Sequence, residues 1–365
     1  MPTIHFSGST LTKSYDAEDL RPGVAVMLSF ATLTRLPVSK RFGYRAVERE
    51  RFKAMLRARR AAGPADEGTG KRASGHVASH FLDSGAFTLR PAAAAYAKAQ
   101  GLGRWAYYDT PEFYSYLDDY AAFVKKFRRG IDLYANVDVI PNAELSWRNQ
   151  QYLEAKGLRP VPVVHYRTDL KWLRHYMDRG HRLVGLGGLV GSQAAPDCRR
   201  WLDRAFGIAC GGPGGLPTVR LHGFGVTAFD LLVRYPWWSV DSTTWVMVEA
   251  NGSVLVPPRR GSEFRFDRRP LVVRVTQGPK ANTTGRGHYL SMPPAARAVV
   301  RAWLDEVGVP LGRNGPGGEP AEHGVINRNA ERRAVNLHYF ERLRAALPPW
   351  PWPFRAARRP GLGVW

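Results

Sequence analysis

Cysteine is nearly absent from this chain of 365 residues, which contains only Cys198 and Cys210. The two lie twelve positions apart without a CxxC pair. That spacing argues against a disulfide framework and against a cysteine-rich zinc site. No run reaches the roughly 18 apolar residues of a membrane span, and the N-terminus lacks the basic and then apolar design of a signal peptide. We therefore expect a soluble, cytoplasmic protein without a metal site and without membrane contact.

Acidic residues are few relative to basic ones. Asp and Glu number 31 against 53 Lys and Arg, which gives a formal charge of +22. A positive field of this size raises the local concentration of a polyanion, and each phosphate contact releases counterions. Nucleic acid is therefore the expected partner, and an arginine bias from a GC-rich genome is the alternative. The same charge disfavours a sugar-processing glycosidase, because carbohydrates supply no polyanion.

Short apolar runs alternate with amphipathic segments along the first two thirds of the chain, which is typical of a parallel α/β domain. We expect strands at 24–33, 77–82, 131–140, 160–166, 182–186, 218–223 and 238–240. We expect helices at 42–62, 92–100, 111–128, 142–157, 168–179, 196–208 and 227–234. These units favour an eight-stranded, TIM-like (β/α)8 barrel over residues 1–250, with a mobile Gly-rich loop at about 63–76.

From about residue 252 the pattern changes. Residues 253–256 and 263–275 are typical of an Arg-rich β-hairpin, and 293–307 and 329–347 of two helices. The segment between those helices has the composition of a linker. We expect residues 251–365 to form a basic C-terminal extension that packs on the barrel and contacts nucleic acid.

Two aspartates follow apolar runs and begin turns of small residues: Asp83 in FLDSGAF and Asp241 in VDSTTW. Barrel enzymes keep catalytic groups at the C-terminal ends of strands. Two carboxylates that flank a glycosidic carbon can break and remake the bond with retention, one as nucleophile and one as proton shuttle. Asp83 and Asp241 are therefore the candidate catalytic pair, with Ser84 and Gly85 beside the substrate. An Asp-Ser-Gly turn can also simply cap a helix.

Further polar and glycine-rich strand ends are candidates for substrate binding. Asp138 can accept hydrogen bonds from the donor edge of a guanine-like base, and His165 can line the same pocket, although a lone histidine is more often a packed one. The run GLGGLVG at 185–191 allows a close approach to the backbone. Its ligand can be a phosphate or a flat base, and tight packing against a neighbouring segment is the alternative interpretation.

Four motifs together resemble the guanine transglycosylases: DSGAF, GLGGLVG, LHGFG and VDST occur in the family's order and approximate spacing, over residues 77–245. The resemblance implies that Asp83 is the general acid/base, Asp241 the nucleophile and Asp138 the residue that recognises the base. The positions that match the loop and strand around the base are Gly187, Gly188, Leu189, His222 and Gly223.

Two departures separate this chain from the tRNA-acting members of that family. No CxCxxC-plus-His zinc site follows Asp241, and VVHY stands in place of a VQGG-like strand end. In both respects the chain is more similar to the DNA-modifying, often phage-borne branch that inserts 7-deazaguanine derivatives such as 7-cyano-7-deazaguanine. That likeness implies DNA rather than tRNA and a free 7-deazaguanine base as substrates, no cofactor, and the cytoplasm of a bacterial host.

Other readings stay open. The chain can instead be a zinc-less tRNA guanine transglycosylase, or a non-catalytic barrel subunit that binds nucleic acid. A homodimer or accessory proteins are compatible with either.

Overall fold

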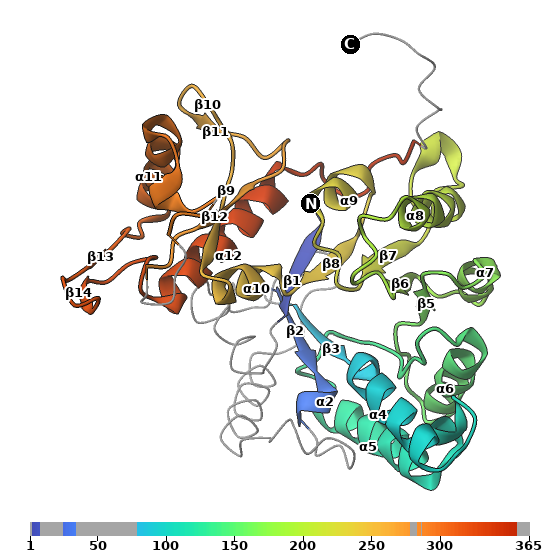
Figure 1. The fold of residues 1–365 in the computed structure, drawn as a ribbon. Coiled ribbons are helices and arrows are strands. Elements are labelled where there is room, and N and C mark those ends of the chain that lie inside the picture. The colour runs from blue at the N-terminus through green and yellow to red at the C-terminus, as the bar shows by residue number, and fades with distance from the viewer. Residues whose placement is uncertain (1, 8–24, 34–78, 278–282, 286, 356–365) are drawn as a thin grey trace.

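An eight-stranded parallel sheet lies at the centre of the molecule (Figure 1). The computed structural model describes residues 2–7, 25–33, 79–277, 283–285 and 287–355. Its strands are, in chain order, β1 (Thr3–Ser7), β2 (Ala25–Ser29), β3 (His80–Asp83), β4 (Leu133–Tyr134), β5 (Val163–His165), β6 (Leu183–Gly187), β7 (Arg220–Gly223) and β8 (Ser239–Ser242). They are arranged in the order β4-β3-β2-β1-β8-β7-β6-β5, and all neighbours are parallel.

The sheet is a curled half-barrel rather than a closed barrel. The first and last strands are neighbours, as in a (β/α)8-like fold, but no ladder joins the edge strands β4 and β5. One isolated parallel bridge, between Ala135 and Val161, spans that edge. Strand β4 has only two residues, because the chain soon turns to start the next helix. At this turn Val139 N–H donates a hydrogen bond to the Ser146 hydroxyl. The predicted strand at 131–140 is thus much shorter in the structure, and the expected closed barrel is seen only as this open form.

Strand β1 is not predicted by the sequence pattern. Its side chains alternate, with Ile4 and Phe6 in the outer core and His5 and Ser7 on the inner side of the curl, where they contact other strands. Five residues with two polar ones are too few for the alternation to be recognised. The strand nevertheless lies between β8 and β2 and holds the two halves of the sheet together.

Two separate apolar clusters stabilise the sheet. The inner one, formed by Met27, Phe81, Ala135 and Val161 with Phe224 packed against them, fills the inside of the curl. The larger one lies between the strands and the surrounding helices. Because strand side chains alternate between two faces, both clusters draw on the same strands. The inner cluster occupies the middle of the curl and leaves room for polar groups at the C-terminal ends of the strands.

Helices surround the outside of the curl (Figure 1). They are α2 (Phe30–Leu33), α4 (Ala86–Ala99), α5 (Pro111–Phe127), α6 (Ala143–Ala155), α7 (Lys171–Asp178), α8 (Pro196–Ala209), α9 (Phe229–Arg234) and α10 (Thr244–Ala250), with 3-10 turns η1 (Ala106–Asp109) and η2 (Pro213–Gly215). The helices predicted at 111–128, 142–157, 196–208 and 227–234 are confirmed within a few residues. The Thr110 hydroxyl caps α5 by accepting from Phe113 N–H, and Pro111 occupies the first turn.

Two helix starts differ from the prediction. Helix α4 begins at Ala86, directly after the left-handed Gly85, so Pro91 lies inside it. Helix α7 begins at Lys171 rather than at residue 168, because the Asp169 carboxylate accepts a hydrogen bond from Lys171 N–H. The helix expected at 42–62 and the loop expected at 63–76 lie outside the described residues.

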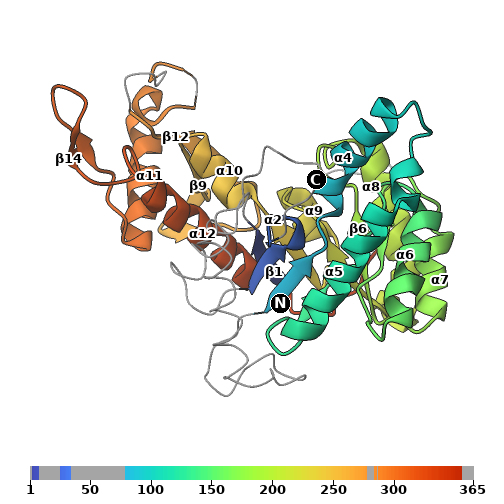
Figure 2. The ribbon, with the colours of Figure 1, turned by 90° about the horizontal axis from the view of Figure 1, so that it is seen from below.

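The C-terminal extension gathers at the end of the molecule opposite α4 to α8 (Figure 2). It consists of β9 (Ser253–Val256), β10 (Arg259–Arg260), β11 (Glu263–Phe264), β12 (Leu271–Arg274), η3 (Tyr289–Ser291), α11 (Pro294–Val307), β13 (Arg313–Asn314), β14 (Pro320–Glu322) and α12 (Asn329–Ala346). Strand β9 pairs with β12, and β10 and β11 form a small ribbon between them. The segment predicted as a linker carries the hairpin β13–β14. Both predicted helices are confirmed.

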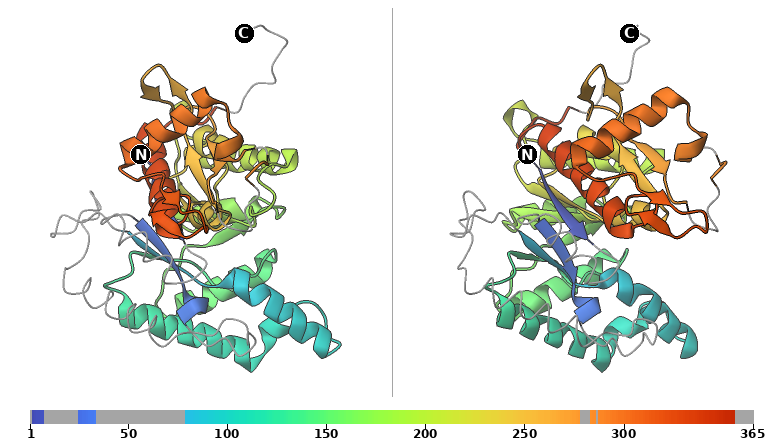
Figure 3. Two further views of the ribbon diagram at one scale, coloured as in Figure 1. Left: turned by 60° about the vertical axis from the view of Figure 1, so that its left-hand side comes forward. Right: turned by 90° about the vertical axis from the view of Figure 1, so that its left-hand side faces the viewer.

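Helix α12 joins the extension to the sheet. It lies beside β1 in both views of Figure 3, and the Phe340 ring meets Phe6 edge-on at 6.4 Å between centroids. The buried Asn336 side chain donates to Trp245 O and accepts from Leu255 N–H, so it links α10 to β9. The extension therefore shares a hydrophobic core with the sheet. Within the described part of the chain, no helix combines the length and apolar character needed to cross a bilayer.

Candidate active site

Three aspartates lie at the C-terminal ends of the strands. Asp83 is the last residue of β3, Asp241 lies near the end of β8, and Asp138 follows β4 by four residues. The negative charges of Asp138 and Asp241 both raise the pKa of Asp83, so the three carboxylates share one electrostatic environment. Asp138 and Asp241 are 7% and 6% exposed, which makes the group accessible only at its rim.

The pKa of the Asp83 carboxyl is raised to about 7, first by burial and then by the charge of Asp138. Hydrogen bonds from Ser29 and from Gly85 N–H, the latter at 3.1 Å, oppose this rise in pKa. A carboxyl with a pKa near neutrality can both give and take a proton at the same pH. Asp83 therefore has the acid–base character expected of a proton shuttle.

Two hydrogen bonds orient Asp241. The Ser7 hydroxyl donates to Oδ2 at 3.1 Å, and Gly225 N–H donates to Oδ1 at 2.6 Å. Gly225 has φ of +65°, and a Cβ there would lie 2.6 Å from Val190, so glycine is required. The Gln193 amide supports this turn by donating to Gly225 O at 2.6 Å. Each oxygen of Asp241 is thus held in place by one donor.

The sequence pattern did not single out Ser7 or Gln193. Ser7 belongs to the unpredicted strand β1. The only sequence signal for it is the alternation with the apolar Ile4 and Phe6, which places Ser7 on the opposite, inner side of the strand. Gln193 lies in an irregular loop, where no periodic signal exists.

Asp138 and His165 form a close pair, with 2.6 Å between Asp138 Oδ2 and His165 Nε2. Both side chains are buried, and His165 Nδ1 has no hydrogen-bond partner among the described residues. The charge of Asp138 also adds to burial in raising the pKa of Tyr108 to about 12. Asp138 is the more exposed member of the pair, at 7% against 1% for His165, so its carboxylate is the group that can meet a ligand.

The glycine run at 185–191 makes room for side chains. A Cβ at Gly185 would lie 2.4 Å from the Phe224 ring, and one at Gly187 would lie 3.0 Å from His165. Gly188 takes the left-handed conformation directly after β6. The Leu189 side chain packs in the outer core, away from the inner side of the curl. Close packing is thus the observed role of Gly185 and Gly187.

His222 lies beside Asp241 without exposure to solvent. Its Nδ1 is 2.7 Å from Ser239 Oγ, and its Nε2 is 3.6 Å from Asp241 Oδ1. Burial lowers the pKa of His222, although Asp241 opposes that shift. The His222 ring also contacts the inner cluster, with 4.6 Å between its centroid and that of Phe81. His222 therefore supports the carboxylate from within the protein.

Two further predicted residues face away from the carboxylates. A Cβ at Gly223 would meet Val226 and Trp237, which belong to the outer core. Ser84 is fully buried, and its carbonyl accepts a hydrogen bond from the Tyr116 hydroxyl. The structure therefore brings together Asp83, Asp138, His165, Asp241 and His222, while Ser84, Leu189 and Gly223 are part of the supporting packing.

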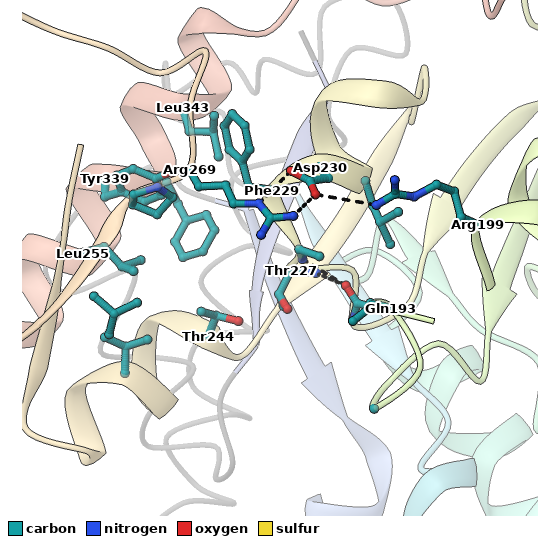
Figure 4. A pocket seen from close by; sticks show the side chains of 18 residues that line it. Gln193, Arg199, Thr227, Phe229, Asp230, Thr244, Leu255, Arg269, Tyr339 and Leu343 are labelled. Atoms are coloured by element: carbon teal, nitrogen blue, oxygen red, sulfur yellow. Dashed lines mark hydrogen bonds and ion pairs between the residues drawn. The ribbon is translucent and has the colours of Figure 1, made fainter. Parts of the chain in front are cut away.

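A cavity of about 570 Å³ lies between the start of α9 and the extension (Figure 4), and none of the three aspartates lines it. Tyr339 and Leu343 of α12 line its far side. The Arg269 guanidinium points at Asp230 and lowers the pKa of that carboxyl, and Arg199 approaches the same carboxylate at 3.6 Å. Both arginines of this cavity therefore pair with the same carboxylate. Gln193 lines the cavity and supports Gly225, so it connects the cavity wall to Asp241.

Among the described residues, no group of three or more His, Cys, Asp or Glu side chains is arranged to hold a metal ion. Cys198 and Cys210 are buried and unpaired. Comparison with models of protein families and with curated proteins gives no match for this chain. Inference about function therefore depends on the motifs and on the geometry of the three carboxylates.

Proposed function

We propose that this protein replaces guanine in DNA with a free 7-deazaguanine base, through a covalent bond between Asp241 and C1′ of the deoxyribose. The observation that carries the proposal is the shared environment of Asp83, Asp138 and Asp241, in which the pKa of Asp83 is raised to about 7. The site lies at the C-terminal ends of the strands of an open, (β/α)8-like half-barrel. Two carboxylates with different environments at one site are what a retaining displacement requires.

The reaction has two displacements. In the first, an oxygen of Asp241 attacks C1′, the bond from C1′ to guanine N9 breaks, and protonated Asp83 gives its proton to the departing base. In the second, Asp83 takes the N9 proton of the incoming deazaguanine, whose N9 attacks C1′ and releases Asp241. Two inversions return the original configuration. One glycosidic bond replaces another, so no net oxidation or reduction occurs.

Asp138 and His165 are assigned to base recognition. Since His165 Nε2 occupies Asp138 Oδ2, the remaining oxygen Oδ1 can accept from N1–H or from the exocyclic amine of guanine. The incoming 7-deazaguanine carries the same donors on that edge, so one pair serves both bases.

DNA is the proposed substrate because of the charge of the chain. The target base has to leave the stack, which costs a few kcal/mol. Phosphate contacts by a protein of formal charge +22 supply binding energy through counterion release.

The covalent intermediate gives the sharpest test. Incubated with labelled guanine-containing DNA and no incoming base, the protein is expected to form an adduct that survives denaturing electrophoresis. Asp241→Asn is expected to form none, while Asp119→Asn, at an exposed position on α5, keeps the adduct. Asp83→Ala is expected to bind DNA and to lose exchange. An undiminished adduct with Asp241→Asn would eliminate the assigned nucleophile.

The polynucleotide is tested separately. Labelled guanine offered with duplex DNA and with tRNA is expected to enter DNA only. Entry into tRNA alone selects the zinc-less tRNA enzyme, and entry into neither, with no adduct, selects a binding subunit without catalysis.

A further inference from the structure

A second cavity, of about 630 Å³, lies on the outer side of β5. We name it the basic cavity, because three arginines from three elements line it: Arg167 in the turn after β5, Arg174 on α7 and Arg204 on α8. All three are exposed. The only acidic residue that lines it is Asp169.

Three guanidinium groups against one carboxylate leave the basic cavity with a net positive charge among its lining residues. The Asp169 carboxylate accepts from Lys171 N–H at 2.8 Å and so is engaged at the start of α7. None of the three guanidinium groups forms an ion pair with a described residue, although Arg167 lies 5.2 Å from the Tyr166 ring centroid and experiences the charge of Asp197. The cavity beside α12 differs, since its arginines share Asp230. Three exposed arginines around one cavity can bind an anionic ligand, and the planar fork of arginine suits phosphate.

The turn that carries Arg167 is strained and held in place. Arg167 has φ of +72°, and it is the only residue other than glycine with a positive φ in the described part of the chain. Thr168 closes the turn by donating from its N–H and its hydroxyl to His165 O, at 3.0 and 2.6 Å. Trp201 of α8 donates its indole N–H to Thr168 O at 3.2 Å. A side chain kept in a disfavoured backbone conformation by several contacts indicates a functional constraint.

The basic cavity is close to the candidate active site. Arg167 follows His165 by two residues, so their Cα atoms lie at most about 7 Å apart. His165 in turn contacts Asp138. Phosphates along one strand of duplex DNA are spaced by about 3.4 Å of helix axis, so a nucleotide near Asp138 has neighbouring phosphates within reach of the cavity.

We propose that the basic cavity binds a backbone phosphate of the nucleic acid, one or two nucleotides from the guanine that is exchanged. Arg174 and Arg204 hold the phosphate, and Arg167 contacts it from the side of the active site. This proposal rests on the proposed function only in taking nucleic acid as the substrate.

The first test measures how binding depends on salt. Arg174→Gln/Arg204→Gln is compared with Lys125→Gln/Arg129→Gln, which removes two exposed positive charges near the N-terminal end of β4, whereas the turn of the basic cavity follows the C-terminal end of β5. The slope of log K against log salt for duplex DNA is expected to decrease in magnitude by about 1 to 2 in the first variant. The control is expected to keep the wild-type slope. Equal slopes in the two variants would overturn the proposal.

The second test locates the phosphate, first with wild-type protein and then with the arginine variant. Duplexes carry one uncharged methylphosphonate at successive positions around the guanine. Wild-type protein is expected to lose affinity at one or two positions, and Arg174→Gln/Arg204→Gln is expected to be insensitive at those positions. A uniform profile in wild-type protein contradicts a specific phosphate site.

A third arm separates the two sources of phosphate. If inorganic phosphate binds wild-type protein and not the arginine variant, while both DNA measurements are unchanged, the cavity serves a free phosphate and the proposal is wrong. Altered slopes without base exchange would leave the phosphate site standing and refute the exchange activity. Base exchange with unaltered salt slopes would support the exchange activity and refute the phosphate site.

Discussion

At the scale of single residues, environment gives three aspartates different properties. Asp83 is desolvated and lies near two other carboxylates, so its pKa is raised to about 7. Asp241 is held by Ser7 and Gly225, and Asp138 is engaged by His165. In the function we propose, one residue type serves as proton shuttle, oriented nucleophile and hydrogen-bond acceptor, depending on the contacts of each side chain.

The raised pKa of Asp83 predicts a particular dependence of stability on pH. Between pH 4 and 7 the folded protein binds a proton at Asp83 that the unfolded chain does not, so the free energy of unfolding falls as pH rises and levels off above 7. Asp83→Asn removes this dependence. The variant is therefore expected to gain stability relative to wild type across this window, by at most about 4 kcal/mol at about 1.4 kcal/mol per pKa unit.

Urea unfolding at pH 5, 6, 7 and 8 measures this difference, with Asp119→Asn as the exposed control. If the stabilities of Asp83→Asn and wild type follow parallel curves against pH, the pKa of Asp83 is not raised by the fold.

At the scale of elements, the glycines of β6 leave space for side chains of neighbouring segments. Gly185 and Gly187 occupy inward positions of the strand, and the space that their side chains would take is filled by Phe224 and His165. The end of β5 and the segment directly after β7 therefore pack against β6. A glycine run that resembles a ligand loop in sequence is here also a packing device.

Gly185→Ala is expected to destabilise the protein by about 1–3 kcal/mol, because the new Cβ would lie 2.4 Å from the Phe224 ring. The double variant Gly185→Ala/Phe224→Leu is expected to recover part of that loss. Gly207→Ala is the control: no atom lies within 4 Å of its Cβ position on α8, so it is expected to stabilise by up to about 1 kcal/mol. Chemical denaturation measures all three, and a neutral Gly185→Ala would show that the ring moves freely.

At the scale of the whole molecule, the extension and the sheet form one hydrophobic core. Phe6 of β1 meets both Trp245 of α10 and Phe340 of α12. Asn336 joins the same elements through hydrogen bonds to backbone groups. The boundary near residue 250 therefore divides the chain in sequence, while one hydrophobic core extends across it. Helix α12 lies beside β1 (Figure 3).

Because the core is shared, unfolding is expected to be a single transition. Far-UV circular dichroism and tryptophan fluorescence are expected to give the same midpoint in wild-type protein. Asn336→Leu leaves buried backbone groups unpaired and is expected to lower stability by about 1–3 kcal/mol, with both midpoints shifted together. Separate transitions, or a shift in only one signal, would mean that the extension unfolds independently of the sheet.

Local patterns in the sequence determined much of this protein. The alternation of apolar runs and amphipathic segments predicted the parallel α/β class and most helices, because burial on one face leaves a period that can be read along the chain. The position of an acid after an apolar run predicted that Asp83, Asp138 and Asp241 end strands on the same edge of the sheet. Strand β1 and the hairpin β13–β14 escaped prediction because short segments carry too few residues for a period.

Only the tertiary structure decided which side chains meet. Ser7 reaches Asp241 because β1 lies beside β8, and those residues are more than 200 positions apart in sequence. Arg167, Arg174 and Arg204 surround one cavity because a strained turn and two helices converge there. Such contacts depend on strand order and on the curl of the sheet, which follow from the packing of the whole chain and leave no periodic trace around any one of these residues.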